Sequence, residues 1–206
     1  MNTTVRKKRS DGERSRNAIL REAAQLATVE GITGLSIARL AEAVGMSKSG
    51  LFAHFGSKEE LQLATVETAN AIFVEQVIRP AEEAAGGLER LRRLSDGYLH
   101  YVEAGTFAGG CFFASALTEV DMRPGPVRDA LVAFNEDWMR RLEAAAREGQ
   151  ADGTIDPAAD VGQLAFDLEA ALFLANAQFV VVRTSEPIER ARTAIDRRLQ
   201  SVAIAA

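Results

Sequence analysis

Apolar residues recur in this chain at the three- and four-residue spacing of an α-helix along almost its whole length. We find no run in which apolar and polar residues alternate as they do in a half-buried strand. Such a chain can bury its apolar faces only by packing helix on helix. The sequence therefore predicts an all-α protein of about nine helices. Helix signals place these at about residues 10–29, 36–44, 47–55, 57–79, 87–104, 110–119, 126–148, 160–182 and 186–203.

Several helix boundaries are marked by residues with a clear physical role. Ser36 and Ser47 can each cap the N-terminus of a short helix, and Ser57 followed by Glu60 has the spacing of a capping box. Pro80 is expected to end the helix that begins there, because proline lacks a backbone N–H and clashes with the preceding turn. The first helix is expected to begin at Ser10 or Ser15.

Residues 36–55 have the pattern of a helix-turn-helix. Ala41 is small enough to let two short helices approach closely, and Gly45 can take the positive φ that the tight reversal needs. Leu51 can then pack the second short helix onto the first. In this motif the second helix enters the major groove of DNA. The small core is completed by Ile37, Leu40 and Val44.

Charge is divided unevenly along the chain. The first 58 residues hold ten Lys and Arg against five Asp and Glu, a net charge of +5, whereas the rest hold fourteen against twenty-four, a net charge of −10. This asymmetry indicates a basic module on an acidic body, and its alternative is a basic disordered tail. We expect the segment Arg6–Arg9 to be disordered without DNA.

The segment Gly45–Leu61 resembles the TetR family of bacterial transcriptional regulators, whose signature has a Leu-Tyr-x-His-Phe core followed by a Ser/Asn-Lys pair. The resemblance covers about residues 12–72, including the Ile19-Leu20 and Ala23-Ala24 pairs. It implies a DNA-binding domain at 12–72 and a C-terminal domain at 73–206 that binds an effector and dimerises. It also implies a regulator, usually a repressor, that binds double-stranded DNA as a homodimer.

The resemblance also implies roles for individual residues. Lys48 is suited to guanine O6 or N7 or to a phosphate, and Lys58 stands at a helix N-terminus where a phosphate is favoured. Phe52 replaces the family's usual tyrosine and has no hydroxyl for a phosphate, although it can still contact sugar or a thymine methyl, and Gly50 stands where a hydroxyl residue is common. The supporting helix would begin with Ser36 and Arg39; Lys48, Ser49 and Gly50 would face bases; and Phe52, His54 and Lys58 would lie along the phosphates. The candidate DNA-binding residues are these and Ser47.

The C-terminal part is rich in aromatic residues, most of which must belong to an ordinary core. Those with a polar group, and their neighbours, are candidates for contact with an apolar or aromatic effector. Cys111 is the only cysteine and is interpreted as a small buried hydrophobe, with a redox role as the alternative. The candidate pocket residues are Tyr98, His100, Tyr101, Phe113, Phe134 and Trp138.

The last two expected helices each carry an apolar stripe, which the resemblance assigns to a four-helix dimer interface. Two-fold symmetry would set two recognition helices about 34 Å apart on a near-palindromic operator. The alternative is that both stripes are buried within their own subunit. The candidate interface residues are Leu164, Leu168, Leu172, Ala175, Phe179, Ile195 and Leu199.

The sequence indicates a cytoplasmic protein without a membrane span or cofactor. The longest uncharged run in the second half, residues 170–182, has 13 residues, whereas a span needs about 20. No metal-ligand spacing and no nucleophile–base pair is recognisable. Two other classes stay open: a small helical enzyme or carrier whose helix-turn-helix is coincidental, and an adaptor that has lost DNA binding.

Overall fold

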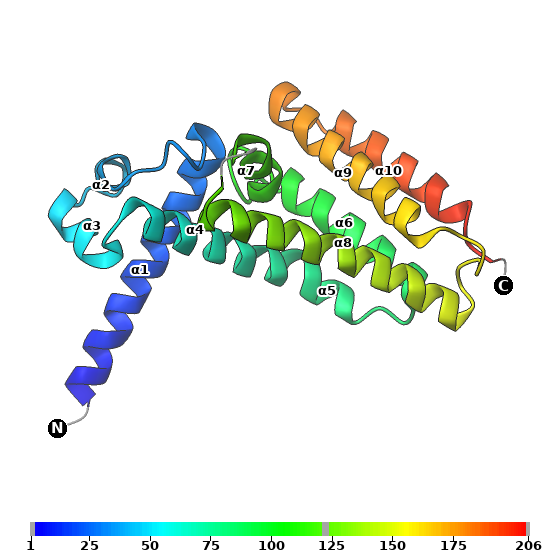
Figure 1. Ribbon diagram of the computed structural model, residues 1–206, viewed down its shortest axis with the longest axis horizontal. Coiled ribbons are helices and arrows are strands. Elements are labelled where there is room, and N and C mark those ends of the chain that lie inside the picture. The colour runs from blue at the N-terminus through cyan, green and yellow to red at the C-terminus, as the bar shows by residue number, and fades with distance from the viewer. Residues whose placement is uncertain (1–2, 121–123, 205–206) are drawn as a thin grey trace.

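The computed structural model describes residues 3–120 and 124–204, and for residues 3–14 it describes the backbone alone. Within these ranges the chain forms ten α-helices and one π-helical segment, which confirms the all-α prediction (Figure 1). The elements are α1 (Thr3–Glu30), α2 (Ile37–Val44), α3 (Lys48–Phe55), α4 (Lys58–Phe73), η1 (Val74–Ile78), α5 (Arg79–Glu82), α6 (Gly87–Glu103), α7 (Phe112–Val120), α8 (Pro126–Asp152), α9 (Val161–Val182) and α10 (Glu186–Gln200).

The helix expected to stop before Pro80 continues to Glu82, so that prediction is wrong. The reason is the π-helical segment η1, in which the backbone N–H of Arg79 donates to the carbonyl of Val74, five residues earlier. This wider turn takes the chain out of the α-helical ladder just before the proline. Pro80 then occupies the second position of α5, where a missing N–H costs little.

Helix α1 begins earlier than expected, at Thr3. The backbone of Arg6–Arg9, for which we predicted disorder, belongs to the first turns of this helix, which projects beyond the rest of the molecule (Figure 1). No proline interrupts the segment, and arginine and lysine have good helix propensity. The side chains of these basic residues lie outside the described part of the chain.

The helix-turn-helix forms as its serines and glycine predict. Ser36 Oγ accepts the backbone N–H of Arg39 at 3.2 Å, and Ser47 Oγ accepts that of Gly50 at 3.1 Å. Gly45 ends α2 with a φ of +66°, which is the left-handed conformation that favours glycine. The core positions Leu40, Ala41 and Leu51 are fully buried.

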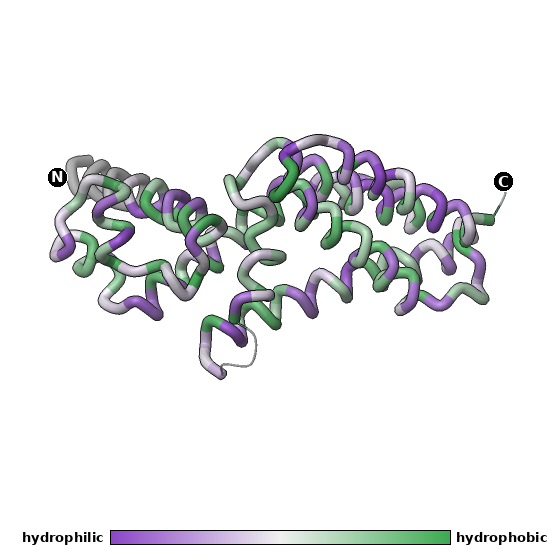
Figure 2. The backbone as a smooth tube through the Cα atoms, turned by 90° about the horizontal axis from the view of Figure 1, so that it is seen from above, coloured by the Kyte–Doolittle hydropathy of each residue, from purple (hydrophilic) through white to green (hydrophobic). Residues whose placement is uncertain are grey.

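The head, formed by α1 to α3, and the body lie end to end along the long axis of the molecule (Figure 2). Gln25 of α1 holds the loop between α6 and α7 with two hydrogen bonds of 2.8 Å, to the carbonyl of Thr106 and the N–H of Ala108. On α7, Glu119 accepts the backbone N–H groups of Ile32 and Thr33 at 2.6 and 2.8 Å. Polar contacts of α1 and of the turn before α2 therefore hold the head against the body, which consists of α4 to α10.

Candidate functional site

One face of α3 is exposed to solvent and carries the residues expected to meet DNA. Lys48, Ser49, Phe52 and Ala53 are exposed, and their spacing of i, i+1, i+4 and i+5 sets them on one side of the helix. Leu51 and Phe55 are buried on the opposite side and anchor α3 to the head. His54 is exposed next to this face. The buried side of α3 therefore anchors it to the head, and the opposite side is open to solvent.

The start of α3 is tightly organised by its cap. Ser47 Oγ bonds to the Gly50 N–H and lies 3.3 Å from Ser49 Oγ. A Cβ added to Gly50 would lie 3.0 Å from Ser47 Oγ. Arg39 and Glu60 stand at the same position after their own serine caps and carry side chains, so this approach does not require a glycine. The Ser47 hydroxyl serves the backbone of α3.

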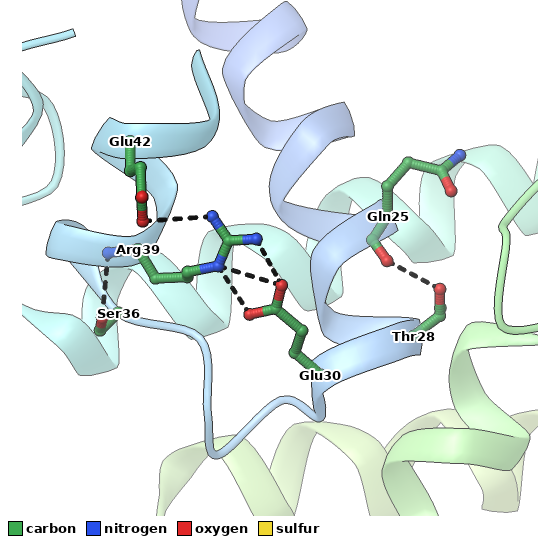
Figure 3. A network of polar contacts seen from close by, with 6 residues as sticks. All are labelled: Gln25, Thr28, Glu30, Ser36, Arg39 and Glu42. Carbon is green, nitrogen blue, oxygen red and sulfur yellow. Dashed lines mark hydrogen bonds and ion pairs between the residues drawn. The ribbon is translucent and has the colours of Figure 1, made fainter. Parts of the chain in front are cut away.

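Arg39 lies between two carboxylates and ties α2 to the end of α1 (Figure 3). Its guanidinium donates to both carboxylate oxygens of Glu30, at 2.6 Å from Nη2 and 2.9 Å from Nε, and its Nη1 lies 3.5 Å from Glu42. These hydrogen bonds lower the pKa of Glu30 and raise that of Arg39. Arg39 therefore positions the supporting helix, as Ser36 does through its cap.

Lys58 is exposed at the first turn of α4, behind the Ser57 cap, whose Oγ accepts the Glu60 N–H at 3.1 Å. The Lys58 ammonium donates to the carbonyl of Thr33 in the turn before α2. This contact uses one of its three donors. A further cation, Arg16 on α1, lies 5.3 Å from the centre of the Phe55 ring, and the sequence pattern gave no sign of that contact.

Five of the six candidate pocket residues meet in one aromatic cluster at the centre of the body. Phe73 of α4 lies in its middle, with ring centroids 5.1 Å from Phe134 and 5.3 Å from Trp138. The rings of Phe113 and Phe134 stack in parallel, with their centroids 3.2 Å apart. The aromatic cluster consists of Phe73, Tyr98, Tyr101, Phe113, Phe134 and Trp138.

His100 does not join the aromatic cluster, because it is exposed while its neighbours Leu99 and Tyr101 on α6 are buried. The rings also fill the space that they enclose, since the void beside Phe73 and Trp138 measures about 10 Å³. A wider cleft of about 550 Å³ lies elsewhere, between α1, α4 and the loop after α6, and its lining is mostly polar. The candidate effector site is thus closed in this conformation.

Glu169 of α9 reaches the edge of the aromatic cluster. The indole N–H of Trp138 donates to its carboxylate at 2.6 Å. Burial raises the pKa of Glu169 to about 6, and the hydrogen bond from Trp138 opposes this effect only in part. Because no ion pair neutralises this carboxylate among the described residues, its ionisation weakens the fold.

We expect Glu169→Gln to raise the free energy of unfolding at pH 7 by about 1–2 kcal/mol, because glutamine keeps an acceptor for Trp138 without the buried charge. The folded pKa of about 6 lies above the ordinary 4.5, so the wild-type protein loses stability as pH rises through this interval. Urea unfolding of both proteins should therefore give equal stabilities near pH 4.5 and a gap that is complete above pH 6. The other carboxyl groups are common to both proteins, and a gap that does not change with pH would contradict the assignment.

Cys111 behaves as the small buried hydrophobe that we predicted. Burial raises the pKa of its thiol to about 11, so it is protonated at neutral pH. Its backbone N–H donates to Oδ1 of the buried Asn176 at 2.7 Å. A protonated, inaccessible thiol is a poor redox sensor.

The apolar stripe predicted as a dimer interface lies inside its own subunit. Helix α9 packs against α6, α8 and α10, and α10 packs against α6 and α9. All its members are buried except Phe179, which is half-buried. The alternative reading therefore applies to Leu164, Leu168, Leu172, Ala175, Phe179, Ile195 and Leu199.

A second apolar stripe covers the outer side of α9. Its members recur at helical spacing and face solvent, with exposed fractions of 63% for Phe166, 56% for Leu174 and 80% for Val181. Helical spacing could have identified them, but the buried side of α9, here called the inner stripe (Leu164, Leu168, Leu172, Ala175 and Phe179), has the same period. The outer stripe consists of Phe166, Ala170, Phe173, Leu174, Ala177 and Val181.

By length and composition, α9 is the one helix in the described residues that qualifies as a membrane span. It is also part of the helical body. Its Asp167 pairs with Arg198 of α10 at 2.7 Å, and its Glu169 accepts the Trp138 hydrogen bond from α8. Its apolar character thus comes from two stripes, one buried in the body and one exposed.

The capped helix-turn-helix with an exposed recognition face, carried on a helical body, defines a DNA-binding transcriptional regulator. The family described as "Bacterial regulatory proteins, tetR family" matches residues 19–65. The domain described as "Tetracyclin repressor-like, C-terminal domain" matches residues 87–195, which is more than half of the chain. The chain belongs to the TetR family, whose members are transcriptional regulators and not enzymes.

Individual relatives agree with this family. The HTH-type transcriptional regulator TcmR of Streptomyces glaucescens is 32% identical over 145 residues, a match that spans 66% of this chain and 61% of TcmR. A TetR transcriptional regulator from Chloroflexus aurantiacus is 26% identical with a TM-score of 0.87, covering 95% of this chain and all of that one. AibR, solved with isovaleryl coenzyme A and operator DNA, is 25% identical with a TM-score of 0.69, covering 90% and 96%.

Proposed function

We propose that this regulator is a cytoplasmic repressor that binds a palindromic operator as a homodimer and is released by a small-molecule effector. The observation that carries this proposal is the exposed face of α3, held from behind by Leu51 and Phe55. The structure of AibR with both an acyl coenzyme A and operator DNA supports the pairing of the two ligands. The corresponding division would be a DNA-binding domain at 12–72 and an effector and dimerisation domain at 73–206.

The proposed contacts follow from the exposure of each side chain and from the hydrogen bonds that it makes. Lys48 and Ser49 would face bases with the backbone of Gly50, and His54 and Lys58 would lie along the phosphates. Lys58 is also placed beside the N-terminus of α4, where backbone N–H groups favour an anion. The hydrogen bonds of Ser36, Arg39 and Ser47 support a positioning role for these three residues.

The outer stripe of α9 supports dimerisation, because apolar surface of this extent on one helix needs a partner. Helix α10 runs beside it (Figure 1) and is acidic in its first turn, at Glu186 and Glu189, and basic in its last, at Arg197 and Arg198. Antiparallel pairing of two copies across a two-fold axis would set each acidic end against a basic end. We therefore propose the outer stripe, and not the inner one, as the centre of the interface.

The effector would be apolar or aromatic and would occupy the aromatic cluster. Tyr98, Tyr101 and Trp138 each combine a ring with a polar group, and Glu169 adds an acceptor at the edge. Because the rings are close-packed, binding requires them to separate. An effector that prefers the separated arrangement would shift the population of the dimer and weaken operator binding.

The proposed function is tested by selecting bound fragments from random DNA and measuring the affinity of single-residue variants for the selected site. Lys48→Ala should cost about 1–3 kcal/mol on the operator and relax the preference at one base pair. Lys58→Ala should weaken all sequences alike and lower the salt slope by about one. Equal losses for Lys48→Ala on operator and random DNA would contradict base reading, and selection of no common sequence would favour an adaptor without an operator.

A further inference from the structure

The exposed face of α3 is partly apolar. Phe52 is 55% exposed at its centre, and Ala53 is exposed beside it. A single exposed phenylalanine is ordinary on a protein surface. This one stands on the face proposed to meet DNA, one turn after Lys48, where water would be displaced on binding.

The polar capacity of the same face is small. The Ser47 hydroxyl is engaged by the Gly50 N–H, and Gly50 has no side chain. This leaves Lys48 and Ser49 as the polar side chains beside Phe52. Direct hydrogen bonding to base edges by α3 is thus limited to few groups, and a second kind of readout is needed for a specific site.

The major groove offers one apolar group on the base edges, the C5-methyl of thymine, and phenylalanine and alanine side chains are suited to it. A phenyl ring gains nothing beside a phosphate, because it has no hydroxyl to donate. From this we propose that Phe52, supported by Ala53, determines operator specificity by contacting a thymine methyl in each half-site. The inference rests on the proposed function, since it assumes that α3 enters the major groove.

The position of this thymine is also constrained. Lys48 and Phe52 are one helical turn apart, about 5–6 Å along the axis of α3, and successive base pairs are about 3.4 Å apart. The thymine should therefore lie one or two base pairs from the base that Lys48 reads. Each half-site would then combine one polar and one apolar determinant.

The test replaces each thymine of the selected operator in turn with deoxyuridine, which removes the methyl group and keeps the hydrogen-bonding edge. At one symmetric position we expect about a fourfold loss of affinity per half-site, and about 15-fold when both half-sites are changed. Phe52→Ala should bind thymine and deoxyuridine operators equally. Phe52→Tyr should keep the methyl dependence because it keeps the ring. Ser49→Ala removes a polar side chain from the same face and should also keep the methyl dependence, whatever its effect on the affinity itself.

The outcomes separate the two proposals. If the protein selects a common sequence and no thymine methyl matters, or if Phe52→Ala keeps the dependence, the methyl readout is overturned while the operator proposal stands. If no common sequence is selected, both fail. Because Phe52 is exposed, its variants should have the melting temperature of the wild-type protein, and melting curves followed by circular dichroism check this.

Discussion

Ala177→Arg is expected to leave the chain folded but monomeric, with operator affinity reduced by about 100- to 10,000-fold. Ala177 lies in the outer stripe of α9, exposed between Phe173 and Val181. An arginine there would place two charges at the two-fold axis, where each would lose water without gaining a partner. A monomer carries one recognition helix and loses the high effective concentration that links two half-sites.

Light scattering after gel filtration measures the first effect, because the monomer has a mass of 22.2 kDa. Fluorescence anisotropy with labelled operator measures the second. The matched control is Ala144→Arg, since Ala144 is an exposed alanine on α8, outside the outer stripe. A variant that stays dimeric and binds the operator would show that this stripe is not the interface.

The helix-turn-helix of the head could be predicted from the sequence, because each of its features depends on local chemistry. Ser36 and Ser47 cap their helices through contacts three residues away, and Gly45 turns the chain with its own positive φ. These interactions do not depend on distant parts of the chain. A pattern of caps, glycines and apolar spacing is then sufficient to locate α2 and α3.

The exposed side of α9 could not be predicted in the same way. Helical spacing shows which residues share a face, but α9 has two apolar faces of similar period. The choice between Leu168, which is buried, and Leu174, which is exposed, depends on where α6, α8 and α10 pack, and that is tertiary information. The prediction that the helix ends before Pro80 is wrong for a related reason, because a π-helical turn leaves no signal in the spacing of the apolar residues.

The aromatic cluster lies between these cases. The sequence located five of its six members by their aromatic side chains, but it missed the central residue, Phe73, and included the exposed His100. Phe73 belongs to α4, whereas the other rings lie far along the chain. Only the packing of α4 against α8, and of the following η1 against α6, brings them together.

The central position of Phe73 leads to the second large prediction. Phe73 is 1% exposed, and its ring packs edge to face against five other rings, with ring centroids 6.2 Å apart or less. Phe73→Ala should lower the free energy of unfolding by about 3–5 kcal/mol, because it removes these contacts and leaves a cavity. For a chain of this size the melting temperature should fall by about 10 °C.

Calorimetry at fixed protein concentration measures this loss, since the proposed dimerisation would make the melting temperature depend on concentration. Phe52→Ala is the matched control, because it removes the same side chain from an exposed site and should change stability by less than about 0.5 kcal/mol. The cavity in Phe73→Ala should also bind benzene or indole and recover part of the lost melting temperature, as apolar cavities of this kind stay dry. Recovery in the variant, without any in the Phe52→Ala control, would indicate that the centre of the aromatic cluster accepts an aromatic ligand once its rings are separated. A loss below about 1 kcal/mol would mean that the rings around Phe73 close over the gap, and the aromatic cluster would then be too pliable to distinguish one effector from another.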